Sequence, residues 1–205
     1  MENQGFKLVL GSAPQPVIPR EGRWRQVICV NSSGWMARKL GLKTPDLTIL
    51  GRFKFLPHRK GDLLALEGLE NDSLMLIHHS YAPTVSEIED TLGKLSYRYR
   101  NIEVISVDQR ASIISSATGY QFHDQGLKVS NGVFAVCVAL QEKDNKVVIA
   151  GISLEKDGHS HGSGNRVRGH RLADRTALWV MRHKCCNLWT TEEDLTRLTG
   201  IRSLQ

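Results

Sequence analysis

Apolar and polar residues alternate along this chain in short blocks. Runs of apolar, often β-branched residues that end in glycine, proline or polar residues predict buried strands. The predicted strands are 6–10, 25–31, 46–51, 74–78, 102–107 and 146–154. The run at 146–154 is the most informative, because a loop rich in glycine and histidine follows it directly.

Segments with helical spacing or helix-capping residues lie between these strands. The predicted helices are 33–40, 62–69, 86–95, 132–141, 169–184 and 192–198. Strands that alternate with helices over short connections favour a mostly parallel sheet with helices on both faces. We therefore predict an α/β fold, a single Rossmann-like domain over residues 1–205. Strands 6–10, 27–31 and 147–152 should lie at its centre, because they are apolar on both faces.

The composition of the chain bears on where in the cell the protein is expected. The 205 residues are 40% hydrophobic, but no apolar run approaches the roughly 20 residues that span a bilayer. The N-terminus lacks the basic and apolar regions of a secretory signal, so we expect a cytoplasmic protein. The four cysteines show no C-x-x-C spacing and are expected to be reduced and buried.

The net charge of +6 predicts an anionic partner. A nucleotide-sugar fits, and so does peripheral contact with an anionic surface at the inner face of a membrane. Nucleic acid is disfavoured, because aromatic residues make up only 6% of the chain and form no spaced stacking series. The chain has neither the G-x-G-x-x-G spacing of dinucleotide-binding loops nor a P-loop.

Loops that follow a predicted strand or open a predicted helix are candidates for a nucleotide site. Their residues are Gly11, Ser12, Asn31, Ser130, Asn131 and Gly132. Glycine permits close backbone approach, while hydroxyl and amide groups hydrogen-bond a ligand. The apolar helix predicted at 132–141 would present its N-terminal N–H groups, which attract phosphate. A tight turn at the first loop and helix caps at the others are the alternative interpretations.

Histidines and arginines gather after the strand predicted at 146–154. They include His159, His161, Arg166, Arg168 and His170. Histidine suits proton transfer near neutral pH, and arginine suits phosphate. Asp174 follows His170 at a spacing that places both side chains on one helix face, where the carboxylate could orient the imidazole or raise its basicity. Solvated loop residues and a simple helix start are the alternative.

Taken in order, these segments resemble the sialyltransferase-like enzymes that use nucleotide-sugars. Residues 9–14 (VLGSAP), 27–31 (VICVN) and 45–47 (PDL) resemble the opening of those enzymes, where two strands end in a glycine loop and an asparagine. Residues 130–132 (SNG), running on to the strand at 147–151, resemble their small sialyl motif, in which a helix start contacts the cytidine nucleotide.

The histidines extend this resemblance. His159 or His161 resembles the short third motif, and His170 with Asp174 resembles the last motif, in which a histidine precedes an acidic residue. The chain also departs from the family pattern. Ser12 stands where an asparagine is expected, Ser-Asn-Gly replaces Ser-Thr-Gly, and the acidic residue comes four rather than five positions after His170.

The resemblance implies an inverting, metal-independent glycosyltransferase of polysaccharide biosynthesis. It would move sialic acid, or Kdo as in the related Kdo transferases, from a CMP-sugar donor to a glycan or glycolipid acceptor. His170 would act as general base with Asp174 beside it, and His159 or His161 would assist. Arg166 or Arg168 would offset the charge of the departing phosphate. No Asp-x-Asp motif is present, and no metal or other cofactor is expected.

Functions of other classes remain open from the sequence. The same sheet could form a non-catalytic nucleotide- or polyanion-binding accessory protein of polysaccharide assembly. A hydrolase or pyrophosphokinase of the related pterin-type fold is a further alternative, with a preference for purine triphosphate and magnesium. The absence of clustered carboxylates at the predicted strand ends disfavours that alternative.

Overall fold

The computed structural model describes residues 5–19, 24–56, 60–78, 83–142, 146–159 and 169–204. Its strands are β1 (Phe6–Leu10), β2 (Trp24–Val30), β3 (Leu47–Gly51), β4 (Ser73–Ile77), β5 (Asn101–Ile105), β6 (Val147–Ala150), β7 (Leu188–Thr190) and β8 (Arg202–Ser203). They form one eight-stranded sheet in the order β5-β4-β3-β2-β1-β6-β7-β8. Every described strand pair is parallel. The predicted parallel α/β fold is confirmed.

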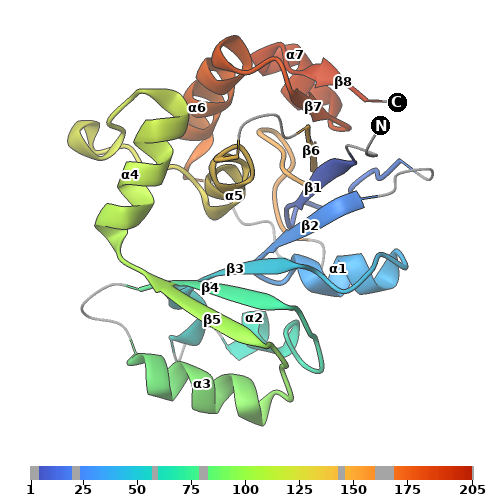
Figure 1. Cartoon of the computed structure of the whole chain (residues 1–205), viewed down its shortest axis with the longest axis vertical. Coiled ribbons are helices and arrows are strands. Elements are labelled where there is room, and N and C mark those ends of the chain that lie inside the picture. Colours follow the sequence, from blue (N-terminus) through green and yellow to red (C-terminus); the bar gives the residue numbers. More distant parts are fainter. Residues whose placement is uncertain are drawn as a thin grey trace.

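Helices cover both faces of this sheet (Figure 1). They are α1 (Ser33–Lys39), α2 (Lys60–Leu64), α3 (Val85–Lys94), α4 (Val107–Thr118), α5 (Asn131–Ala139), α6 (Arg171–Lys184) and α7 (Glu193–Thr199), with 3₁₀ helices η1 (Arg52–Phe55) and η3 (His123–Gln125). Helices α4, α5, α6 and α7 pack on one face, and α1, α2 and α3 pack on the other. Within the described ranges, no helix offers an apolar segment long enough to span a bilayer.

The central strands are buried on both faces, as predicted. In β1, the side chain of Val9 packs in the same core as α5, whereas Leu8 and Leu10 pack in the core with α1. All three have no exposed surface. Alternate side chains of a strand point to opposite faces, so a strand apolar at successive positions needs a helix layer on each side. This explains why β1, β2 and β6 occupy the middle of the sheet.

Helix α4 was not predicted from the sequence, because its serine and β-branched residues are weak helix formers. Its ends nevertheless carry specific signals. Ser106 Oγ accepts the N–H of Gln109, and the side chain of Gln109 accepts the N–H of Ser106, which forms a capping box. Gly119 closes the helix in the left-handed conformation, with φ of 74°. Local capping thus offsets a poor helical pattern.

Strand β6 ends at Ala150 and not at residue 154. Gly151 adopts φ of 63°, and Ser153 Oγ then accepts the N–H groups of Glu155 and Lys156, so the chain turns away from the sheet. Strands β7 and β8 were missed because they are only two or three residues long. The helix predicted at 62–69 is also shorter, since α2 ends at Leu64.

The cysteine prediction is half right. Cys29 and Cys137 are buried, and burial raises the pKa of each thiol to about 12. Cys185 is half-buried and Cys186 is exposed, because they follow the end of α6, where the chain leaves the core. The prediction that all four are buried is therefore wrong for the adjacent pair.

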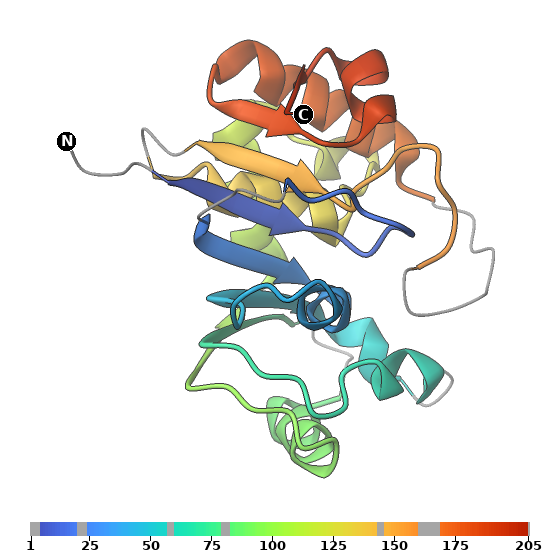
Figure 2. The same cartoon turned by 90° about the vertical axis from the view of Figure 1, so that its right-hand side faces the viewer.

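The topology creates a natural ligand crevice. From β1 the chain builds outward through β2 to β5, then returns to place β6 on the other side of β1. The loops that follow β1 and β6 consequently leave the sheet at the same edge, as Figure 2 shows in blue and orange. In open α/β sheets, ligands bind at such a switch point, beyond the carboxyl ends of the strands.

Candidate functional site

A cavity of about 280 Å³ lies at this switch point, between the ends of β1, β2 and β6 and the starts of α5 and α6. Most of the site residues predicted from the sequence line it. They are Gly11, Ser12, Asn31, Ser130, Asn131, Gly132, His159, His170 and Asp174. The remaining predicted site residues, His161, Arg166 and Arg168, lie outside the described residues. Five separate segments of the chain thus meet at one cavity.

On one side of the cavity, the ends of β1 and β6 are in close backbone contact. The N–H of Ala13 donates to the carbonyl of Gly151 at 2.7 Å. A Cβ atom at Gly11 would lie 2.2 Å from the carbonyl oxygen of Gly151, so no larger residue fits there without a backbone shift. Gly151 adopts a positive φ that glycine tolerates without strain. These two glycines allow the backbones to touch.

The ends of β2 and β3 meet the start of α5 through side-chain amides. Asn31 is left-handed, with φ of 55°, and its Oδ1 accepts the N–H of Gly51 at 3.3 Å. A Cβ atom at Gly51 would lie 2.5 Å from Nδ2 of Asn131. Gly51 therefore leaves room for Asn131. Gly51 was not predicted as a residue that shapes the site, although its position at the end of a predicted strand was an available signal.

Ser130 joins the starts of α5 and α6. Its Oγ accepts the N–H of Val133 at 3.3 Å, which confirms the predicted helix cap. Its own N–H donates to Oδ1 of Asp174 at 2.7 Å. Asp174 is buried, with 6% of its surface exposed. This carboxylate therefore fixes the helix start that lines the cavity.

The predicted histidines occupy different positions in the site. Ser12 Oγ and His159 Nδ1 are hydrogen-bonded at 2.9 Å, which ties the loop after β1 to the loop after β6. His170 stands at the N-cap position of α6, but its side chain makes no capping hydrogen bond. The interpretation of His170 as a simple cap is therefore not supported by this geometry.

The pKa of His170 lies below its ordinary value of 6.5. Burial is the largest cause, the positive charge of Lys128 is the next, and that of Arg110 adds to them. A hydrogen bond with the backbone of Lys128 offsets part of the shift. The suggestion that Asp174 raises the basicity of His170 is thus opposed by the direction of the shift, which burial and the nearby cations determine.

Lys128 is a site residue that the sequence analysis missed. It lines the cavity beside the start of α5, and its pKa is lowered by burial first and then by the charges of Arg110 and Arg52. Like charges held this close repel each other, and an anionic ligand would relieve that repulsion. Only a lysine two positions before the predicted cap marked this feature in the sequence.

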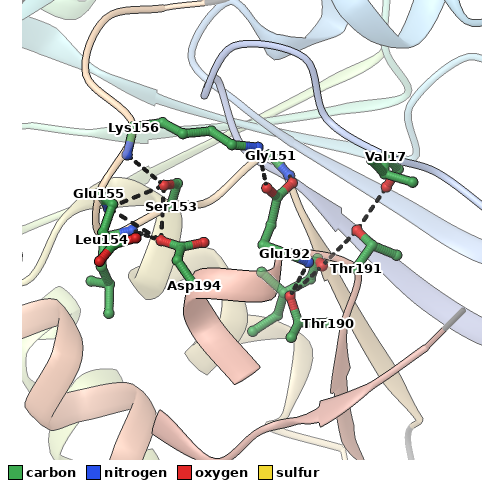
Figure 3. A network of polar contacts seen from close by, with 11 residues as sticks. Val17, Gly151, Ser153, Leu154, Glu155, Lys156, Thr190, Thr191, Glu192 and Asp194 are labelled. Carbon is green, nitrogen blue, oxygen red and sulfur yellow. Dashed lines mark hydrogen bonds and ion pairs between the residues drawn. The ribbon is translucent and has the colours of Figure 1, made fainter. Parts of the chain in front are cut away.

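Two buried carboxylates near the start of α7 accept hydrogen bonds from the loop after β6 (Figure 3). Glu192 accepts the N–H of Gly151 at 2.7 Å and pairs with Nζ of Lys156 at 2.7 Å. Asp194 Oδ2 accepts the Ser153 hydroxyl at 2.9 Å and the N–H groups of residues 154 and 155 at 2.6 and 3.1 Å. The loop that carries His159 toward the cavity thus begins from a fixed base.

Metal binding has no obvious location in the described part of the chain. There, no group of three or more histidine, cysteine, aspartate or glutamate side chains is arranged to hold an ion. The cavity instead combines one buried carboxylate with nearby histidine, lysine and arginine side chains.

No family model matches the sequence, and no curated protein matches it significantly. Solved structures do match. The chain has the fold of bacterial sialyltransferases. The sialyltransferase CstII from Campylobacter jejuni, bound to the substrate analogue CMP-3FNeuAc, aligns with a TM-score of 0.62 and 12% identity over 98% of this chain and 86% of its own. The monofunctional α-2,3-sialyltransferase Cst-I from the same organism aligns with a TM-score of 0.59 and 11% identity, over 98% and 82%.

A further similar structure is CST-II in complex with a trisaccharide acceptor and CMP. It has a TM-score of 0.57 and 10% identity, over 95% of this chain and 85% of that one. At such identities the likeness concerns the fold. The resemblance to sialyltransferase-like proteins predicted from the sequence is therefore confirmed at the level of the fold.

Proposed function

We propose that this protein is an inverting glycosyltransferase that moves a sugar acid, sialic acid or Kdo, from a CMP-sugar donor to a hydroxyl group of a glycan acceptor. One observation carries the proposal. The residues predicted for the nucleotide and the residue predicted as general base, although far apart in sequence, line one cavity at the switch point of the sheet. The solved structures of the same fold include complexes with CMP and with a CMP-sugar analogue, which supports the same donor class here.

The nucleotide would lie along the ends of β1, β2 and β6 and the start of α5. The amides of Asn31 and Asn131 can each donate and accept, which suits a base edge or a ribose hydroxyl. The first N–H groups of α5 have no partner within the helix, so they suit the phosphate. Lys128, which lines the same cavity, adds a positive charge for that phosphate.

The transfer would be a single displacement at the anomeric carbon. An acceptor oxygen forms a bond to that carbon, while the bond from the carbon to the phosphate oxygen of CMP breaks on the opposite side. Neutral His170 takes the proton of the acceptor hydroxyl, and its lowered pKa keeps it neutral at pH 7. The start of α5 and Lys128 stabilise the negative charge that develops on CMP. No step requires a metal ion.

Binding is tested by titrating the protein with CMP. We expect CMP to bind more tightly than UMP, AMP or GMP, since the donor is a cytidine nucleotide. The double substitution of Asn131→Ala and Gly132→Val should abolish binding, because the amide is lost and the valine Cβ would lie 3.3 Å from the Ile152 side chain in the cavity wall, which must then shift. Unchanged binding by the double variant would contradict the assigned nucleotide site.

Transfer is tested by CMP release from CMP-sialic acid and from CMP-Kdo, with and without glycan acceptors and with a metal chelator present. Acceptor-dependent release that persists in the chelator supports the proposal. CMP binding without any donor turnover would instead favour the non-catalytic nucleotide-binding role.

A further inference from the structure

A second cavity, of about 330 Å³, lies next to the first, between α4 and residues 121–129. Its wall is mostly apolar and includes Ala111, Ile114, Phe122 and Leu127. Cavities of this size that combine an apolar wall with a few polar groups are typical small-ligand sites. Nothing in the proposed transfer step uses this cavity.

The two cavities share a wall. Lys128 and Val129 line both of them. The second cavity therefore adjoins the place where His170 and the start of α5 lie, so a ligand that occupied both cavities would have to pass Lys128 or Val129. A sugar alone is too polar to fill such an apolar space favourably.

Arg110 gives the second cavity its charge. It lines the cavity, although only 8% of its surface is exposed. Its Nη2 donates to the carbonyl of Val129, and its guanidinium faces the ring of Phe134 at 5.3 Å. Its Nε is buried and has no hydrogen-bond partner among the described residues. A buried donor without a partner is destabilising, and because Nε is covered, a small shift of the side chain toward the cavity would let it donate to an incoming acceptor atom.

We propose that the second cavity binds the apolar chain of an anionic amphiphile, whose phosphate or carboxylate contacts Arg110. The inference rests on the proposed function in one respect, namely that this amphiphile is the non-sugar part of the acceptor. The acceptor would then be a glycan joined to an apolar chain through an anionic group. Its reacting hydroxyl lies in the first cavity, its anionic group lies beside Arg110, and its apolar chain lies against Phe122 and Ile114.

The electrostatics of the region agree with an anionic ligand. Lys128 and Arg110 are close enough that the charge of Arg110 lowers the pKa of Lys128, and burial lowers the pKa of both. A guanidinium binds phosphate or carboxylate oxygens in a fixed planar geometry, so Arg110 can supply specificity as well as charge. The charge of Asp174 favours the charged form of Arg110 but does not cancel the effect of burial, and a neutral apolar ligand would add no further compensation.

Binding is tested with octyl phosphate below its aggregation concentration, by calorimetry on the full chain without nucleotide. Inorganic phosphate and 1-octanol are the comparison ligands. We expect octyl phosphate to bind at least tenfold more tightly than either. Ala111→Trp should lower its affinity at least tenfold by filling the cavity, whereas Ser112→Trp, on the exposed side of the same helix, should not. Arg110→Leu should reduce the advantage of octyl phosphate over 1-octanol.

Each other outcome overturns the inference. If inorganic phosphate binds as tightly as octyl phosphate, the site recognises an anion only. If Ala111→Trp leaves the affinity for octyl phosphate unchanged, while CMP binding by the variant shows that it is folded, the octyl chain does not lie in this cavity. Equal binding of 1-octanol and octyl phosphate would remove the role of Arg110.

A transfer experiment separates this inference from the proposed function. The acceptor sugar is supplied free and as its octyl phosphodiester, and KM is measured for the wild-type protein and for Ala111→Trp. We expect the phosphodiester to have at least a tenfold lower KM with the wild-type protein only. If no acceptor is used but octyl phosphate still binds as expected, the proposed function fails and the ligand site remains. If both acceptors are used with equal KM, the assignment of the amphiphile as acceptor fails alone.

Discussion

On the side formed by β1 and β6, the first cavity is bounded mainly by backbone groups and by the hydrogen-bonded pair of Ser12 and His159. On the side formed by α5 and the start of α6, it is bounded by ionisable side chains. The first side contains the Gly11 and Gly151 contact and the loop held by Glu192 and Asp194. The second contains Lys128, His170 and Asp174. We infer that the first side fixes geometry and the second performs chemistry, so substitutions on the two sides should fail in different assays.

The largest effect is expected on the ionisable side. His170→Ala should lower sugar transfer by roughly 10²–10⁴-fold, the usual loss for a general base. CMP affinity should stay close to wild type, because His170 is assigned to the acceptor proton and not to the nucleotide, whereas loss of its hydrogen bond with the backbone of Lys128 should lower the unfolding temperature slightly. Single-turnover CMP release with acceptor present measures the rate. Equal rates in wild type and variant would remove His170 from the mechanism and make His159 the next candidate.

On the side formed by β1 and β6, Asp194→Ala should act on stability. The substitution removes a buried acceptor shared by a hydroxyl and two backbone N–H groups. We expect a loss of about 3 kcal/mol, which lowers the unfolding midpoint by roughly 6–12 °C for a chain of this size. The exposed neighbour Glu193 provides the matched control, since Glu193→Ala should change the midpoint little. A midpoint for Asp194→Ala equal to that of the control would refute the anchoring role.

Gly11→Ala should also destabilise the protein, by about 1–3 kcal/mol, because the added methyl group meets the backbone of Gly151 and forces a shift. Gly93 in α3 is the control, because a Cβ atom there meets nothing within 4 Å. Gly93→Ala should stabilise the helix by about 0.5–1 kcal/mol. Denaturant unfolding measures both. If the two substitutions shift the free energy of unfolding in the same direction, the inferred close contact between the backbones of Gly11 and Gly151 is wrong.

The smallest effect concerns pH. His170 acts as a base only when neutral, so transfer should fall as the pH drops through its folded-state pKa, which lies below 6.5. Removing the charge in Lys128→Gln raises that pKa, and the acidic limb of the rate profile should move to higher pH. Lys94→Gln, at an exposed position in α3, should leave the limb in place. A profile that does not move in Lys128→Gln would show that Lys128 does not act on the titrating group.

The sequence predicts the centre of this molecule better than its edges. Strands β1, β2 and β6 were found because they are apolar on both faces, and the start of α5 was found because Ser130 and Gly132 are local signals. Helix α4 lacks a clear apolar period, so only its capping residues marked it. The part of the site that was missed depends on contacts between distant segments.

Those distant contacts explain the remaining errors. Glu192 and Asp194 read as ordinary acidic residues in the first turn of a helix, and nothing near them in sequence indicates that they bind the loop after β6. In the sequence, nothing distinguishes Lys128 from a solvated loop residue, because its role depends on the packing of α4 and α6 beside it. Each of these roles follows from the three-dimensional neighbours and not from spacing along the chain.

The anchoring of the loop after β6 has a consequence for how the protein is made. Gly151 is separated from its partner Glu192 by 41 residues, which take about 2–8 s to synthesise at roughly 5–20 residues per second. During that interval β1 and β6 have already been synthesised, but the loop that leads to His159 lacks both carboxylates. A nascent chain would therefore hold the nucleotide-facing strands before it holds a finished site. The segment that carries Glu192 and Asp194 is therefore required for the site, and a chain stopped before residue 192 cannot anchor the loop after β6.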